Sequence, residues 1–311
     1  MMIYPKVSII VPAYNEEETI ADCIQSLLNL NYPKNMYEIL IVDNNSTDAT
    51  SKIIQKYHNI SYFNERKQGT ATARNLGIKK SKGEILAFID ADCVASKNWL
   101  INLIEEFNPN TKIAGIGGKI RVFHPSSIIE KFGNLRLYNQ EQFIEGTSGQ
   151  PPFLATGNCA YKAKILKKVG SFDTSFITSE DNDLGWRVHF LGYQLAYASK
   201  AIVYHRMPKT LFSVLKRQFV YGQDNAKLIN KHRKYLKKYY ESSAVISRFI
   251  VWDIVKLPRW FKKVFISLMP NSNKNKKERI LHLLTPFLDF LIYLSFRLGM
   301  IYQTLKIRKN E

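Results

Sequence analysis

Three short apolar segments, separated by helical patterns, constrain the fold of this chain more than any other feature. Residues 7–11, 38–42 and 85–89 are runs dominated by β-branched and aliphatic side chains, which is typical of strands buried on both faces. Residues 16–30, between the first two runs, carry apolar side chains at helical spacing, and residues 71–80 are expected to form a helix before the third run. This repeated strand–helix–strand order predicts an α/β fold, in which helices cover a mainly parallel sheet.

The remainder of the chain is less regular and then becomes basic. Residues 111–170 contain Gly-rich and Pro-rich breaks, which predict shorter strands and loops. The net charge is +19, and residues 1–199 contribute only +1 of it, from 21 Lys and Arg against 20 Asp and Glu. Residues 200–311 contribute +18, from 24 against 6. A neutral body followed by a cationic region indicates an anionic partner, with lipid and nucleic acid both possible on charge alone.

Carboxylates follow two of the predicted strands. Asp43 ends the second apolar run, and Asp90 and Asp92 follow the third with one residue between them. Ligands bind at the carboxyl ends of the strands in sheets of this kind. Oxygen ligands suit Mg²⁺ or Mn²⁺, and such an ion can bridge to a diphosphate. The alternative is a turn with solvated acids, because turns favour Asp.

The chain resembles the family 2 glycosyltransferases of the GT-A fold over most of its first 220 residues. Six segments in family order carry the resemblance: 7–17 (VSIIVPAYNEE), 41–50 (IVDNNSTDAT), 69–77 (GTATARNLG), 88–92 (FIDAD), 155–161 (ATGNCAY) and 180–187 (EDNDLGWR). The resemblance implies inverting transfer of a sugar from a UDP- or GDP-sugar, assisted by Mn²⁺ or Mg²⁺. Its extent predicts a catalytic domain over residues 1–224, and the cationic, helical pattern of the remaining sequence predicts a basic amphipathic helical region over 225–311.

The resemblance assigns roles to nine residues of this sequence. The nucleotide sugar is expected to contact Pro12, Tyr14, Glu16, Asp43, Arg74 and Asp90. Asp92 is expected to bind the metal, and His205 lies where relatives often have a histidine near metal or diphosphate. Asp181 is expected to be the general base, because inversion requires the acceptor hydroxyl to lose its proton as it attacks. The metal would neutralise the charge that develops on the leaving diphosphate.

Two departures from the family pattern affect these expectations. Asn44 stands where relatives commonly have a second Asp. The Gln-x-x-Arg-Trp motif of some membrane-embedded relatives has its nearest counterpart at residues 217–222, without the Arg and Trp at the motif positions. This difference favours a transferase that adds a single sugar over a processive synthase.

The C-terminal region predicts contact with a membrane surface. Residues 281–302 are about long enough to span a bilayer, since roughly 20 residues suffice. Asp289 and Arg297 oppose insertion, since each charge costs about 2.5–3.5 kcal/mol at mid-bilayer, and Pro286 disfavours a straight helix. An amphipathic helix at an anionic surface fits better, with aromatic anchors at Trp252, Trp260, Phe261 and Phe265. The alternative is a helical subdomain with a solvated basic face.

These features predict a peripheral protein at the cytoplasmic face of the membrane, acting on a lipid-linked or cell-envelope glycan. Three widely spaced cysteines without metal spacing indicate reduced thiols, and no signal peptide is recognised at the N-terminus. Two other functions remain open, a basic nucleotide-binding module and a nucleotidyltransferase. The first lacks a nucleic-acid motif, so we expect no nucleic-acid partner. The second should have a Gly-rich basic loop where residues 12–16 read PAYNE.

Overall fold

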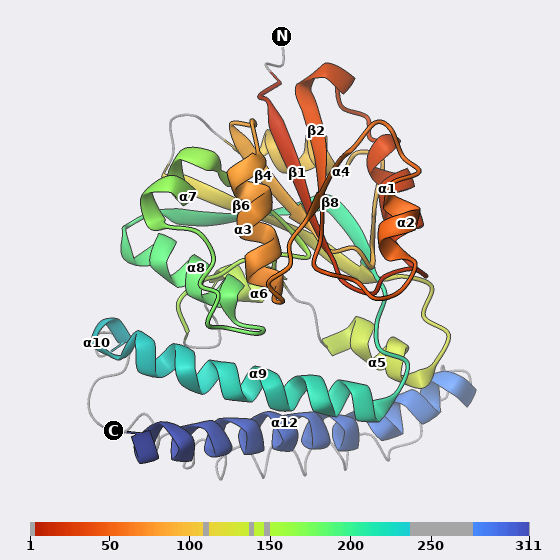
Figure 1. Cartoon of the computed structure of the whole chain (residues 1–311). Helices are drawn as coiled ribbons and strands as arrows, with labels where there is room; N and C mark the ends of the chain where they lie inside the picture. The colour runs from red at the N-terminus through yellow and green to blue at the C-terminus, as the bar shows by residue number, and fades with distance from the viewer. Residues whose placement is uncertain (1–3, 108–111, 137–139, 146–149, 237–275, 311) are drawn as a thin grey trace. The chain divides into compact units, whose positions relative to one another are not determined.

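The computed structural model describes residues 4–107, 112–136, 140–145, 150–236 and 276–310. The chain divides into two compact units (Figure 1). The first comprises Met1–His124 and Arg136–Met207, and the second comprises Pro125–Leu135 and Pro208–Glu311. The boundary expected at residue 224 lies within helix α9 (Leu211–Lys231), and the second unit includes the whole of this helix.

The first unit is built on one sheet of eight strands in the order β3-β2-β1-β4-β7-β6-β8-β5. The strands are β1 (Val7–Ala13), β2 (Tyr37–Asp43), β3 (Ser61–Asn64), β4 (Ile85–Ile89), β5 (Cys93–Ala95), β6 (Ile113–Val122), β7 (Asn158–Lys162) and β8 (Gln194–His205). Four of the seven neighbouring pairs are parallel. The other three are antiparallel, because β7 lies between β4 and β6 and β5 pairs with β8. The sheet is therefore mixed, with its parallel part where the three apolar runs predicted it.

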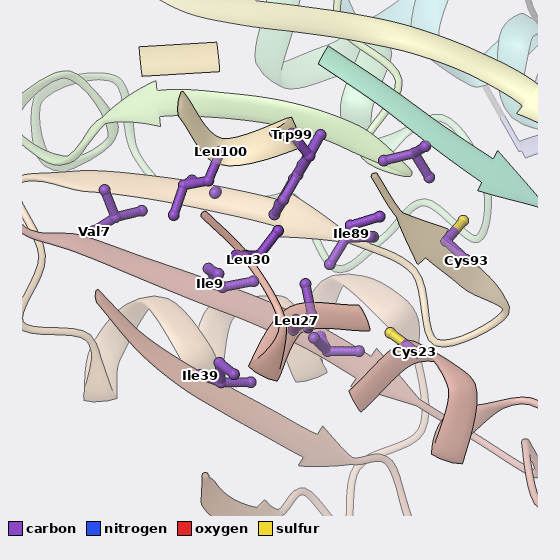
Figure 2. Packing of buried hydrophobic residues seen from close by; sticks show 14 of the residues in the cluster. Val7, Ile9, Cys23, Leu27, Leu30, Ile39, Ile89, Cys93, Trp99 and Leu100 are labelled. Atoms are coloured by element: carbon purple, nitrogen blue, oxygen red, sulfur yellow. The ribbon is translucent and has the colours of Figure 1, made fainter. Parts of the chain in front are cut away.

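Helices cover both faces of this sheet (Figure 1). They are α1 (Ile20–Leu28), α2 (Thr50–Ile54), α3 (Thr70–Lys80), α4 (Trp99–Glu105), α6 (Gln140–Glu145), α7 (Ala163–Val169) and α8 (Glu180–Phe190), with a short 3₁₀ turn at Lys34–Met36. Alternate side chains of a strand point to opposite faces. Ile9 of β1 accordingly packs with Leu27 and Trp99 in one core cluster (Figure 2), whereas Ile10 belongs to the cluster on the other face.

The Gly-rich stretch at 114–118 is a buried strand and not a break. It forms the middle of β6, between β7 and β8. A Cβ at Gly118 would collide with the carbonyl oxygen of Ala201, and one at Gly117 would meet the side chain of Gln140. These glycines therefore permit close approach of neighbouring groups. In the sequence alone, such a cluster of glycines is easily mistaken for a loop.

The second unit contains α5 (Ile128–Arg136), α9, α10 (Arg233–Leu236) and α12 (Lys276–Asn310). Helices α9 and α12 lie side by side (Figure 1), with backbone contact at two glycines. A Cβ at Gly222 would overlap the carbonyl oxygen of Phe296, and one at Gly299 would overlap that of Phe219. Helix α12 continues past Pro286. The aromatic anchors expected at residues 252–265 lie outside the described residues.

One face of α12 is apolar and exposed. We call its members the α12 apolar stripe: Ile280, Leu283, Leu284, Phe287, Leu294, Leu298, Ile301, Tyr302 and Leu305. They recur at three- or four-residue spacing and so share a single helix face. By length and composition alone, α12 could cross a membrane over Leu283–Lys309.

Candidate active site

A buried arginine joins three elements at the carboxyl end of the parallel strands. Arg74 of α3 donates to Asp90, which follows β4, at 2.7 Å and to Glu180, the first residue of α8, at 2.6 Å. Its guanidinium is almost fully buried, which is costly for a charge unless it is paired. The two carboxylates provide that pairing, so Arg74 fixes the start of α8 relative to the end of β4.

Asp181 lies next to this bridge. Its side chain is partly buried, and its Oδ1 accepts a hydrogen bond from the Asn182 amide at 2.7 Å. Burial, followed by the neighbouring Glu180 carboxylate, raises the pKa of Asp181 to about 8, while Arg74 opposes the shift. A carboxylate with a pKa near neutrality is suited to general-base catalysis.

A second cluster unites both expected metal ligands. Cys93 of β5 is directly opposite His205 of β8, and Asp92 immediately precedes β5. The Asp92 Oδ2 is 3.3 Å from the His205 Nε2, and the Cys93 Sγ is 3.5 Å from the Asp92 Oδ1. One ligand atom from each residue lies within 4.8 Å of the other two. Carboxylate, imidazole and thiol groups all bind divalent transition metals, so these residues fit such an ion.

The loops after β1 and β2 are joined by side-chain hydrogen bonds. The Asn15 Oδ1 accepts from the Thr47 amide at 2.8 Å, and the Glu16 amide donates to the Thr50 hydroxyl at 2.7 Å. These contacts leave the Tyr14 side chain 47% exposed at the strand ends, while Pro12 is buried within β1. Tyr14 is therefore free to contact a ligand.

Asp43 is almost enclosed at the end of β2. It is 2% exposed and accepts hydrogen bonds from the Ser46 amide, the Tyr62 hydroxyl and the Asn64 side-chain amide. In this structure Asp43 organises the loop around itself. Its expected contact with a nucleobase stays a prediction.

Asn44 has a structural reason to replace the more common Asp. Its Nδ2 donates to the carbonyl oxygens of Glu65 and Lys67, and its Oδ1 accepts from the Gly69 amide. A carboxylate cannot donate these two hydrogen bonds. Asn44 thus holds the segment that leads into α3 and Arg74.

Glu16 lies close to the acids of the site, and its carboxyl accepts a hydrogen bond from the Thr19 hydroxyl at 2.5 Å. Burial, together with the charges of Asp92 and Asp90, raises its pKa from 4.5 to about 7. Between pH 4.5 and about pH 7 the folded chain keeps a proton on Glu16 that the unfolded chain releases, so the free energy of unfolding falls as pH rises.

We therefore expect Glu16→Gln to raise the melting temperature of the metal-free protein at about pH 8 and to have little effect at about pH 4. Below the unfolded pKa the carboxyl is protonated in both states, and the penalty develops between 4.5 and about 7. Thermal unfolding at several pH values measures the difference. The exposed Glu18→Gln variant controls for the loss of a charge, and an equal gain at all pH values would contradict the assignment.

Comparison with known proteins decides the family. The model of "Glycosyl transferase family 2" matches residues 8–170, which is more than half of the chain. The chain belongs to glycosyl transferase family 2. A relative of this chain, the glycosyltransferase AglE of Haloferax volcanii, is 32% identical over 227 residues, covering 70% of this chain and 72% of that protein.

A second relative is the poly-beta-1,6-N-acetyl-D-glucosamine synthase of Staphylococcus epidermidis. It is 30% identical over 70% of this chain, but the match covers only 54% of the synthase. The chain thus spans about half the length of that family 2 relative.

Solved structures show that this family 2 member has the GT-A fold. The mannosyltransferase PcManGT from Pyrobaculum calidifontis, in complex with GDP-Man and Mn²⁺, matches with a TM-score of 0.61 at 18% identity, covering 94% of this chain and 74% of that one. TarS 1–349 of S. aureus, in complex with UDP, matches with a TM-score of 0.51 at 20% identity, covering 98% and 92%. The fold and family expected from the six motifs are confirmed, which favours the transferase over both alternatives.

The structure also places Glu180 and Cys93 beside the candidate site residues, although the sequence did not single out either of them. Each is adjacent to an assigned residue, Asp181 and Asp92, but adjacency does not reveal a partner that is distant in the sequence. The Arg74–Glu180 pair spans 106 residues.

Proposed function

We propose that this chain is an inverting, metal-dependent transferase that moves a sugar from a nucleotide diphosphate sugar to an acceptor hydroxyl. The observation that carries the proposal is Asp181, a carboxylate with a raised pKa beside the Arg74 bridge at the strand ends. The neighbours of the same fold support the donor class, because PcManGT is described with GDP-Man and Mn²⁺ and TarS with UDP.

The residues of the site divide the work between donor and acceptor. Pro12, Tyr14, Glu16 and Asp43 surround the base and ribose, with Arg74 and Asp90 beside them. Asp181 accepts the proton of the acceptor hydroxyl as that oxygen attacks the anomeric carbon. Asp92 and His205 would hold a divalent ion, which would neutralise the charge that develops on the leaving diphosphate. Arg74 fixes Asp90, on the donor side, relative to Glu180, which precedes the general base Asp181.

Asp92→Ala is expected to weaken metal-dependent binding of the nucleotide by about tenfold or more, because even the loss of an outer-shell partner costs about 10- to 100-fold in metal affinity. Calorimetric titration with UDP- and GDP-sugars, with and without Mn²⁺ or Mg²⁺, measures this effect. Glu105→Gln alters an exposed carboxylate at the end of α4 and is the control. If no nucleotide sugar binds the unaltered protein more tightly with metal, the proposed function is wrong.

We also propose that the second unit binds an anionic membrane surface at the cytoplasmic face, and that the acceptor is a lipid-linked or cell-envelope glycan. The α12 apolar stripe supports the first statement, because nine large apolar side chains on one helix face are exposed. Lys276 and Lys277 precede the stripe and Lys306, Arg308 and Lys309 follow or flank its end, which suits anionic headgroups. The poly-beta-1,6-N-acetyl-D-glucosamine synthase of Staphylococcus epidermidis, a relative named for a polysaccharide product, supports a glycan acceptor.

Replacing Leu298, Ile301 and Leu305 together by Gln is expected to abolish most flotation with anionic liposomes. These side chains are at least 50% exposed, so the change removes apolar insertion with little loss of core packing. Flotation at low and high salt separates the two forces, since salt screens only the electrostatic one. Ile177→Gln with Leu191→Gln alters exposed apolar residues of the first unit and is the control. No flotation of the unaltered chain would favour a soluble helical subdomain, and retention after alkaline carbonate would indicate a spanning helix.

A further inference from the structure

The thiol of Cys93 lies where a third ligand of the metal site would be. Its residue is directly opposite His205 in the β5–β8 pair, and side chains opposite each other in a ladder share one face of the sheet. Its Sγ is 3.5 Å from one oxygen of Asp92, whose other oxygen is 3.3 Å from the His205 Nε2. With metal–ligand bonds of 2.0–2.3 Å, adjacent ligands of one ion are separated by about 3–3.7 Å. The separations of Asp92 from His205 and from Cys93 both fall within or near this range, and each involves a different oxygen of Asp92.

The exposed fractions of the three side chains indicate the side from which an ion would enter the site. The Asp92 side chain is 27% exposed and that of His205 is 8% exposed, whereas Cys93 is fully buried at the edge of the core (Figure 2). An ion that enters past Asp92 thus has the thiol on its protein side. The pairing of β5 with β8 brings the three groups to one place, because one ligand atom from each lies within 4.8 Å of the other two.

Sulfur changes which ions such a site prefers. Mg²⁺ is a hard ion that takes oxygen ligands, whereas Mn²⁺, Co²⁺, Zn²⁺ and Cd²⁺ accept imidazole, and the last three bind thiolate strongly. A site of carboxylate and imidazole already binds Co²⁺ and Zn²⁺ more tightly than Mn²⁺. A thiolate at the third position adds a preference for the softer ones.

We propose that Cys93 is a ligand of the divalent ion, together with Asp92 and His205, and that it gives this transferase a site selective for thiophilic ions over Mg²⁺. The inference rests on the metal site of the proposed function. On binding, the S–H bond breaks, the metal–sulfur bond forms, and the thiol proton passes to the solvent.

Cobalt titration of the full-length, chelator-treated protein without nucleotide tests the proposal. Thiolate coordination gives an intense near-ultraviolet charge-transfer band at one equivalent of Co²⁺, and we expect it for the unaltered chain. Cys93→Ala is expected to remove the band and to lower Cd²⁺ affinity at least about tenfold, while Mg²⁺ affinity changes less than about twofold. Proton release on Cd²⁺ binding, measured in buffers of different ionisation enthalpy, is expected to fall by about one proton.

Two other buried thiols are matched controls. Cys23→Ala alters a thiol of the same core cluster, and Cys159→Ala alters one on the other face of the sheet. Both variants are expected to retain the band, and circular dichroism checks that all three variants fold. Co²⁺ binding without a charge-transfer band, or a band that survives in Cys93→Ala, overturns the inference and leaves the proposed function intact. Absence of Co²⁺ and Cd²⁺ binding also overturns the inference, whereas the proposed function is tested separately by metal-dependent binding of the nucleotide sugar.

Discussion

Replacing Asp181 by Asn is expected to lower kcat by roughly 10²–10⁴-fold, the usual contribution of a positioned general base. The amide has nearly the same shape but cannot accept the proton of the acceptor hydroxyl. The affinity for the nucleotide sugar should change little, because Asp181 acts on the acceptor side. Release of nucleoside diphosphate measures turnover, and calorimetry measures donor binding. Asn182→Ala, a change at the next residue of α8, is the control. An equal loss of donor affinity in the Asp181 variant would contradict the assignment.

The pH dependence of kcat/KM provides an independent test of the role of Asp181. With a pKa of about 8 in the free protein, Asp181 is mostly protonated at neutral pH and cannot act as a base in that form. We expect kcat/KM to rise with pH until about 8 and then to level off. The residual activity of Asp181→Asn should lack this rise, and a rise that persists would assign it to another group.

Replacing Arg74 by Met is expected to destabilise the protein by about 3–5 kcal/mol, because it leaves the buried carboxylate of Glu180 without its partner. The side chains of Arg74 and Glu180 are 4% and 6% exposed, so solvent cannot replace the lost contact. Arg74→Lys should recover only part of the loss, since an ammonium lacks the planar fork that reaches Glu180 and Asp90 together. Urea unfolding measures the free energy, with the exposed Lys79→Ala of the same helix as control.

A double variant tests the physical reason. Glu180→Gln in the Arg74→Met background removes the unpaired buried charge, and it should restore part of the lost stability. Arg74→Met as stable as the control, or additive losses in the double variant, would show that the bridge is not what holds α3 to α8.

The part of the fold that sequence predicted is the part fixed by local pattern. Strands β1, β2 and β4 are continuous apolar runs, and the acids at their ends follow from where those runs stop. Strand β6 was misread because its glycines are required by neighbours from distant segments, Ala201 and Gln140. The position of β7 between β4 and β6 could not be predicted for the same reason, since no local signal in the sequence specifies an antiparallel partner.

The candidate site divides in the same way. Asp92 and Asp181 stand within recognisable motifs, whereas the bridge from Arg74 to Glu180 and the pairing of Cys93 with His205 exist only after the sheet assembles. A pKa near 8 for Asp181 also depends on burial and on Glu180, so composition alone could not indicate it.

The close approach of α9 and α12 at Gly222 and Gly299 affects the environment in which the helical unit can remain paired. Most helix pairs are held by apolar side chains that leave water on association, a driving force that disappears when the surroundings are themselves hydrocarbon. At these glycines the backbones of α9 and α12 touch directly, so part of the attraction is dispersion between close-packed atoms, which lipid does not remove. On the proposed membrane surface, the pair would therefore keep its partner even where lipid replaces water around it.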